Sequence, residues 1–311
     1  MSTALITHPD CFGHTPPRGH PESPARLEAV LVALSAPRFE GLVRVEAPMT
    51  IEEDILRCHT QAHLDRIKSS LPREGWIALD HDTFLSPGSY DAAMRAVGAS
   101  CRGVEMVLAG EVRNAFSATR PPGHHAKADA QMGFCLLNNI AVATKRALDV
   151  HGLKRVALVD FDVHHGNGTQ DILWDEPRAL YVSTHQAPLY PWTGAAEETG
   201  LGNNILNVPM PAGAGSARYR ELFDQKVVPA LDAFKPELLL ICAGFDGHEL
   251  DHLARLGLNE DDFAWITHRL CDVADRHCGG KVVSVLSGGY NLQALSLSVA
   301  AHVGVLMERG A

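Results

Sequence analysis

The sequence lacks the features of a membrane-spanning, secreted or nucleic-acid-binding protein. Its longest apolar run, LLLICAGF, is far shorter than the roughly 20 residues that a membrane-spanning helix needs. The first residues, MSTALITHPD, contain no basic segment followed by an apolar stretch, so we expect no secretory signal. The formal net charge of −10 disfavours a nucleic-acid partner, because such a partner requires a basic face.

Cysteine pairs typical of metal-binding or redox motifs are also absent. The seven cysteines are an odd number, and none of them stands in a C-x-x-C spacing. This usage is typical of a reduced protein, and we expect the chain to be cytoplasmic. The length of 311 residues allows one large α/β domain or two smaller ones, but no repeat or long linker divides the chain.

Short apolar runs alternate with longer amphipathic stretches along the whole chain. Strands separated by helices predict a mostly parallel sheet that is covered by helices on both faces. The predicted strands are residues 4–7, 42–46, 115–118, 156–160, 179–183, 205–208, 238–242 and 282–286. The predicted helices are residues 24–34, 87–109, 136–151, 214–234, 260–277 and 292–307.

Four of the predicted strands are followed by unusual polar or glycine-rich segments. In parallel α/β sheets, ligands bind beyond the carboxyl ends of the strands. We therefore expect these four segments to converge on one pocket. The segments are RPPGHHA (120–126), DFDVHHGN (160–167), GFDGHE (244–249) and SGGYN (287–291).

Asp162 and His164 form a D-x-H motif directly after an apolar strand. In an extended segment these two side chains point the same way, and Asp246 adds a third ligand from another strand end. Three ligands of mixed oxygen and nitrogen type, with one open position, are the pattern of a catalytic zinc site. A dication would also offset the cost of burying these groups. An isolated D-x-H is more often an ion pair or a core histidine, but the other three segments favour the metal site.

The adjacent histidines His124 and His125 lie on a Pro/Gly loop. A neutral imidazole accepts a proton from water near pH 7, provided that its other nitrogen is oriented by a partner. Asp160 and Asn167 flank the metal motif and are placed to orient the two rings. The alternative is a surface pair of histidines with no such partners.

Two aromatic residues stand next to glycines in the same set of segments. Tyr290 follows two glycines, and its phenol is suited to stabilise an oxyanion beside a metal ion. Phe134 follows Gly133 and would wall a narrow channel. Taken alone, Tyr290 is better explained as a tyrosine packed in the core, and Phe134 is equally compatible with a core position.

Read together, the segments resemble the histone deacetylase superfamily, above all class II enzymes and bacterial relatives that include acetylpolyamine amidohydrolases. The resemblance implies the arginase/deacetylase fold, one α/β domain over residues 1–311 around an eight-stranded, mostly parallel sheet flanked by helices. It also implies zinc-dependent hydrolysis of acyl amides such as acetyl-lysine or acetylpolyamines. The matching segments occur in family order: HPESPARL (20–27), DTFLSPGSY (82–90), RPPGHHA, GFCLLNN (133–139), DFDVHHGNGTQDILW (160–174), YVSTHQ (181–186), AGFDGHELD (243–251) and SGGYNL (287–292).

The resemblance also implies a role for each matched residue. Zn²⁺ would be bound by Asp162, His164 and Asp246. His125 would act as general base and then acid, His124 would act electrostatically, and Tyr290 would polarise the acyl carbonyl. Asp160 would pair with His124 and Asn167 with His125. A structural K⁺ would be bound by Asp160, Ser183 and the backbone of Asp162, His164 and Thr184. The substrate channel would be formed by Asp82, Gly133, Phe134, Tyr190, Trp192 and Gly289.

Two departures from the family pattern concern the channel mouth. Trp192 stands where many relatives have glycine, and would narrow the mouth. The segment ELDHLARLGL (249–258) lacks the proline and glycine of the usual DDPLGGL, so this rim loop is expected to differ.

Two other functions are compatible with such a pocket. An arginase-like hydrolase with two metal ions usually needs D-x-D at the third motif, whereas here Asp246 is followed by His248. A binding protein without turnover is disfavoured by the complete set of catalytic residues. We therefore expect an enzyme with a small-molecule or peptide acyl amide as substrate, no nucleic-acid or membrane partner, and possible homo-oligomerisation. His59 and His63 are predicted to lie on a solvated helix face.

Overall fold

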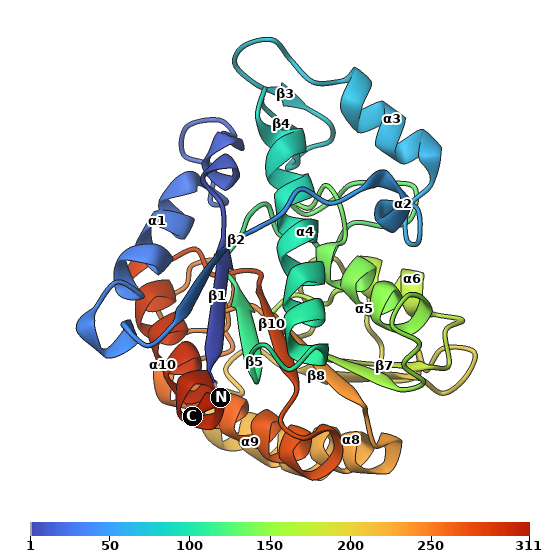
Figure 1. Cartoon of the computed structure of the whole chain (residues 1–311), viewed down its shortest axis with the longest axis vertical. Helices are drawn as coiled ribbons and strands as arrows, with labels where there is room; N and C mark the ends of the chain where they lie inside the picture. Colours follow the sequence, from blue (N-terminus) through green and yellow to red (C-terminus); the bar gives the residue numbers. More distant parts are fainter. Residues whose placement is uncertain (1) are drawn as a thin grey trace.

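An eight-stranded sheet forms the centre of the molecule in the computed structural model, which describes residues 2–311 (Figure 1). The strand order is β2-β1-β5-β10-β9-β6-β7-β8, and every neighbouring pair is parallel. The strands are β1 (Thr3–Thr7), β2 (Val43–Glu46), β5 (Asn114–Ser117), β6 (Val156–Asp160), β7 (Ala179–Gln186), β8 (Ile205–Met210), β9 (Leu238–Ala243) and β10 (Val282–Leu286). A separate antiparallel hairpin pairs β3 (Ile77–Ala78) with β4 (Phe84–Leu85).

Helices cover both faces of the sheet and create two hydrophobic cores (Figure 1). The first core lies under α1 (Pro24–Ala33), α7 (Gly215–Leu222), α8 (Val228–Phe234), α9 (Glu260–Cys278) and α10 (Leu292–Gly310). The second lies under α2 (Glu52–Ile55), α3 (Gln61–Ser69), α4 (Ser89–Leu108), α5 (Asn139–Asp149) and α6 (Asn167–Leu173). The short helices η1 (Pro9–Gly13) and η2 (Pro37–Phe39) lie in connections, and the π-helix η3 (Phe223–Val227) joins α7 to α8.

The central strand β9 has the uninterrupted apolar sequence LLLICA because it is buried on both faces of the sheet. Its side chains alternate between the two faces, so Leu239 and Ile241 belong to the first core while Leu238 and Leu240 belong to the second. All six residues of the strand are buried. A strand covered on both sides has no solvent-facing position that a polar residue could occupy.

The predicted architecture of one domain around an eight-stranded parallel sheet is confirmed, and the differences concern helix boundaries. The helix predicted from residue 136 begins at Asn139, because the side chain of Asn138 caps it by accepting the backbone N–H of Ala141. The helix predicted over 214–234 is interrupted by η3, one turn before Pro229. A helix was expected around His63, where α3 lies, whereas α2, α6 and the β3–β4 hairpin were not predicted.

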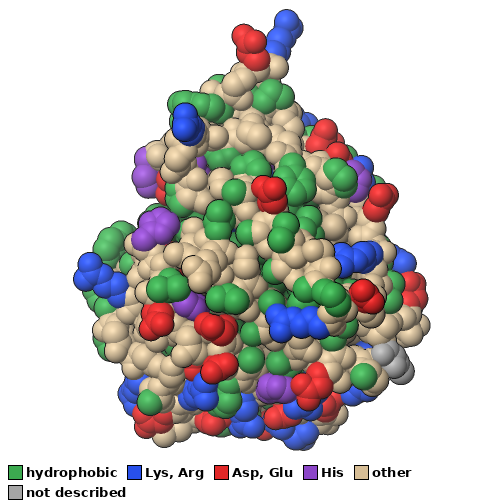
Figure 2. Space-filling model, turned by 90° about the vertical axis from the view of Figure 1, so that its left-hand side faces the viewer, with side chains coloured by type: hydrophobic (Ala, Val, Ile, Leu, Met, Phe, Trp, Pro, Cys, Tyr) green, Lys and Arg blue, Asp and Glu red, His purple; other side chains and the backbone are tan. Residues whose placement is uncertain are grey.

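Two surface properties follow from the fold. No helix within residues 2–311 is both long and apolar enough to cross a membrane. On the face shown in Figure 2, acidic and basic side chains are intermixed, so this face presents no continuous surface of one charge.

Candidate active site

Four adjacent strands of the sheet carry the predicted functional segments at their carboxyl ends. These strands are β5, β10, β9 and β6, which are consecutive in the strand order. The segments after them contain His124 and His125, Tyr290, Asp246, and the Asp162–His164 motif respectively. The predicted convergence therefore has a simple cause, since neighbouring parallel strands end at the same edge of the sheet.

Asp162, His164 and Asp246 form a buried cluster of potential metal ligands. Nδ1 of His164 lies 3.2 Å from Oδ1 of Asp162 and 3.1 Å from Oδ2 of Asp246. One ligand atom of each residue lies within 4.8 Å of the others. The segment from 162 to 164 bends instead of continuing as the extended strand that we expected. The bend nevertheless brings both side chains to the carboxylate of Asp246.

Backbone N–H groups from neighbouring strand ends orient the two carboxylates. The N–H of Gly288 donates to Oδ2 of Asp162 over 2.7 Å, and the N–H of Val163 donates to Oδ1 of Asp246 over 3.0 Å. A Cβ atom at Gly288 would overlap both carboxylates, so only glycine allows this approach. The backbone at the strand ends thus fixes the positions of both carboxylates.

The electrostatics of the cluster fit a divalent cation. Burial and the nearby charge of Asp162 raise the pKa of Asp246 to about 7. Burial alone would lower the pKa of His164, but its contacts with Asp162 and Asp246 outweigh this and raise that pKa to about 10. Two carboxylates held this close need a positive charge between them, and a cation supplies it. The donor set of two oxygens and one imidazole nitrogen suits zinc.

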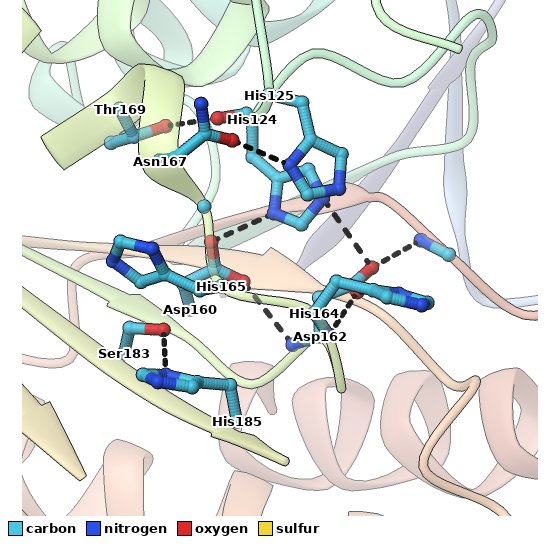
Figure 3. Close-up of polar contacts among 12 residues, drawn as sticks. His124, His125, Asp160, Asp162, His164, His165, Asn167, Thr169, Ser183 and His185 are labelled. Carbon is cyan, nitrogen blue, oxygen red and sulfur yellow. Dashed lines mark hydrogen bonds and ion pairs between the residues drawn. The ribbon is translucent and has the colours of Figure 1, made fainter. Parts of the chain in front are cut away.

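The tandem histidines lie side by side, each with a different partner (Figure 3). Nδ1 of His124 is 3.0 Å from Oδ2 of Asp160, and Nδ1 of His125 is 2.9 Å from Oδ1 of Asn167. The amide oxygen of Asn167 only accepts, so Nδ1 of His125 carries the proton and its Nε2 is left as the acceptor.

The two imidazoles have pKa values shifted in opposite directions. Burial and the charges of His124 and His164 hold the pKa of His125 well below its usual value. Burial opposes protonation of His124 too, but the charges of Asp160 and Asp162 outweigh it and raise that pKa. The arrangement therefore separates the proton affinities of the two adjacent imidazoles, a pattern typical of acid–base sites.

A cavity of about 210 Å³ opens over the cluster. Phe134 and Tyr190 lie in its wall, the ring of Tyr190 standing edge-on to that of His125 at a centroid distance of 5.3 Å. Its lining residues are Asp82, His125, Gly133, Phe134, His164, Leu189, Tyr190, Leu253 and Tyr290.

Two residues that we assigned to the channel do not line this cavity. Trp192 is 74% exposed and lies in a neighbouring groove that shares Leu189 with the channel. Gly289 lies behind the wall, where its positive φ of 119° turns the backbone toward Tyr290. Trp192 therefore extends the outer surface instead of narrowing the channel itself.

The residues assigned to a potassium site lie beneath the cluster. Ser183 on β7 is paired in register with Asp160 on β6, and the Thr184 hydroxyl donates to the backbone oxygen of Asp160 over 3.4 Å. Burial lowers the pKa of His185 to about 3, so this ring is neutral. Its Nδ1, 2.9 Å from Oγ of Ser183, can then accept the hydroxyl proton and leave the oxygen lone pairs free.

Several residues that support the site through buried hydrogen bonds were not predicted from the sequence. The guanidinium of Arg26 donates to the backbone oxygens of Ser287 and Gly289 and lies 4.9 Å from the ring centroid of Tyr290. Glu22 binds both Arg26 and Arg120, which precedes the histidine loop. Glu22 and Arg26 lie in the segment HPESPARL, which matches the family pattern, and this match was the sequence feature that could have pointed to their supporting role.

The prediction for His59 and His63 was wrong, because both rings are buried. His59 donates to the backbone oxygen of Lys127 and accepts the N–H of Asn138, both over 2.8 Å. His63 donates to the backbone oxygen of Leu136 over 2.9 Å. The pair therefore anchors the segment that carries Gly133 and Phe134, a contact between parts of the chain that spacing alone does not reveal.

Comparisons with known proteins identify the family of this chain. The family model of the histone deacetylase domain matches residues 20–306. A histone deacetylase-like amidohydrolase of Pseudomonas aeruginosa is 41% identical over 279 residues, which cover 88% of this chain and 73% of that protein. A probable deacetylase of Archaeoglobus fulgidus is 37% identical over 302 residues, covering 94% and 82% of the two chains. The crystal structure of the HDA15 HD domain matches with a TM-score of 0.93 and 34% identity, covering 99% of this chain and 89% of that one.

The fold and the site together define a hydrolase with the arginase/deacetylase fold. The chain belongs to the histone deacetylase family, whose members here include deacetylases and amidohydrolases.

Proposed function

We propose that the protein is a zinc-dependent amidohydrolase that removes acyl groups from amines, with acetyl-lysine peptides or acetylpolyamines as substrates. The observation that carries the proposal is the arrangement around one cavity of the ligand cluster, the neutral His125 and the phenol of Tyr290. Each of these groups meets a different requirement of amide hydrolysis.

Asp162, His164 and Asp246 would hold the zinc ion. When bound, zinc supplies Lewis-acid polarisation and lowers the pKa of coordinated water. The residue His248 supports one ion instead of two, because its Nε2 lies 3.1 Å from the carboxylate of Glu260 and is engaged there. The D-x-H spacing at the third motif thus gives no second metal ligand, unlike the arginase-like alternative.

His125 is suited to take the proton from the attacking water. Its Nε2 is free to accept, and Asn167 holds the ring in the tautomer that this step needs. The same ring then returns the proton to the departing amine, which must leave in protonated form. His124, whose pKa is raised by Asp160 and Asp162, is suited to stabilise negative charge that develops next to it.

Tyr290 is suited to donate its hydroxyl proton in a hydrogen bond to the acyl oxygen as negative charge develops there. Burial raises the pKa of Tyr290 well above the usual value, so the phenol stays protonated and remains a donor. Phe134 and Tyr190 form apolar walls for the acyl-carrying chain, and Asp82 lies at the mouth, where it would accept an N–H of the substrate.

We further propose that K⁺ binds beneath the zinc site. The oxygen donors are Asp160, Ser183 and the backbone of Asp162, His164 and Thr184. The register pairing of Asp160 with Ser183 supports this assignment.

A substrate panel tests the proposed function directly. Purified protein would be assayed on acyl-lysine peptides, acylpolyamines and simple acyl anilides, with and without a chelator, and its metal content measured. We expect hydrolysis of at least one class, loss of activity with chelator, recovery with Zn²⁺, and one zinc per chain. Binding without turnover across the panel, or two ions per chain, would contradict the proposal.

A further inference from the structure

The rim loop that departs from the family pattern reaches the active site through one carboxylate. Asp251 lies between β9 and α9 and is 6% exposed. Its Oδ2 accepts the backbone N–H of Tyr290 over 2.6 Å and that of Asn291 over 3.1 Å. Its Oδ1 accepts the N–H of Leu253, a residue of the channel wall, over 3.0 Å. One side chain thus connects the tyrosine with the channel wall.

Two side chains of opposite charge bind the backbone around Tyr290. Arg26 binds the carbonyl oxygens before the tyrosine, at Ser287 and Gly289, whereas Asp251 binds the N–H groups at and after it. Gly289 has a φ of 119°, so the chain turns sharply just before the tyrosine. A turn of this kind keeps its direction only where its polar groups have fixed partners.

We propose that Asp251 is a positioning residue that fixes the hydroxyl of Tyr290 over the substrate carbonyl. The inference rests on the proposed function, because it assigns Asp251 to the step in which Tyr290 acts. Loss of the carboxylate leaves the N–H groups of Tyr290, Asn291 and Leu253 without this acceptor, and the turn shifts to find new ones. A misplacement of about 1 Å in an oriented donor lowers the rate by up to roughly 10²-fold.

A double-mutant cycle separates this role from other effects of the same substitution. The set is wild type, Asp251→Ala, Tyr290→Phe and the double variant, with kcat and KM measured for each. We expect Tyr290→Phe to lower kcat by roughly 10²–10³-fold and Asp251→Ala by about 10- to 100-fold. In the Tyr290→Phe background, Asp251→Ala should cost less than about twofold, because the donor that it positions is gone.

Two further variants guard against loss of folding and against a charge effect. Asp251→Asn keeps an acceptor oxygen but removes the charge, so we expect a smaller loss of kcat than with Asp251→Ala. Asp54→Asn is the matched control: Asp54 is a buried carboxylate that binds Arg146, away from the cavity. It should lower the melting temperature and leave kcat within about twofold.

Several results would overturn the inference. Equal losses from Asp251→Ala in both backgrounds would show that Asp251 does not act through Tyr290. Equal losses from Asp251→Asn and Asp251→Ala, with reduced zinc content, would assign the effect to charge near Asp246. A crystal structure of Asp251→Ala with Tyr290 unmoved would refute the proposal without any assay. A wild-type protein that hydrolyses no substrate refutes the proposed function instead, and the crystal structure still decides the position of Tyr290.

Discussion

The floor and the mouth of the channel are built in different ways. The floor consists of His124, His125, Asp162, His164 and Asp246, which are all buried and follow directly from strand ends. The mouth is formed by loop segments, and Trp192 in the groove beside it is 74% exposed. The sheet thus fixes the chemistry, while loops decide which molecule reaches it.

The strongest test of the floor is His125→Ala. We expect kcat to fall by about 10³–10⁴-fold, because the proposed mechanism needs this ring to accept and return the proton. His252→Ala, which removes an exposed histidine of the rim loop, is the control and should change kcat by less than about twofold. Similar losses of kcat from His125→Ala and His252→Ala would contradict the assignment of the chemical step to the floor alone.

Gly133→Ala tests the boundary between floor and mouth. A Cβ at this position would overlap the ring of His125, and the backbone φ of 56° disfavours any side chain. We expect kcat to fall by about 10- to 100-fold as the ring moves. Gly152→Ala carries the same backbone strain, with a φ of 71°, but its Cβ meets no atom within 4 Å. An equal loss of kcat in this control would exclude displacement of His125 as the cause.

Trp192→Ala tests the mouth alone. The residue lies outside the cavity lining, so kcat should stay within about twofold of wild type. For peptide substrates we expect KM to rise by roughly three- to tenfold, since an exposed tryptophan supplies contact area to a long ligand. A small acyl anilide should show no change in KM. A fall in kcat for the anilide would place Trp192 in the floor instead.

The smallest expected effect concerns stability under the floor, where His302 packs against Phe161 and Phe245. Burial lowers the pKa of His302 from 6.5 to about 3. Between these values the unfolded chain binds a proton that the folded chain excludes, so stability falls as the pH falls, by about 1.4 kcal/mol per pH unit for this residue. In His302→Asn, the free energy of unfolding should change less steeply with pH between pH 6 and pH 5, by about 1.4 kcal/mol per pH unit, which corresponds to one proton fewer taken up on unfolding. Urea unfolding at both pH values measures it, and an unchanged slope would contradict the assignment.

Much of the floor could be predicted from sequence because its residues stand in short motifs after apolar strands. The run LLLICA predicts a strand that is buried on both faces, and the rule for parallel sheets then places Asp246 beside Asp162. The specific pairing of His124 with Asp160 and of His125 with Asn167 was implied by the resemblance to the family, and the structure contains both contacts. Local pattern and global fold agree at these positions.

The residues whose positions could not be predicted from the sequence depend mainly on contacts between distant segments of the chain. Asp251 lies 39 residues before Tyr290, and Arg26 lies 263 residues before Gly289. His59 and His63 have the spacing of a solvated helix face, and only the packing of the 127–138 segment over α3 shows that they are buried. The position of Trp192 is set by a loop, for which hydrophobic periodicity carries no information.

The adjacency of β5, β10, β9 and β6 determines where the chain tolerates insertions. The potential metal ligands, the tandem histidines and Tyr290 follow the carboxyl ends of strands, whereas the helices return the chain to the amino ends of the strands. Extra residues at those amino ends would lengthen a connection without moving a single ligand. One added residue between Val159 and Asp162 would instead shift both Asp162 and His164 out of reach of Asp246. Loops at the amino ends of the strands should therefore vary in length far more among relatives than loops at the carboxyl ends.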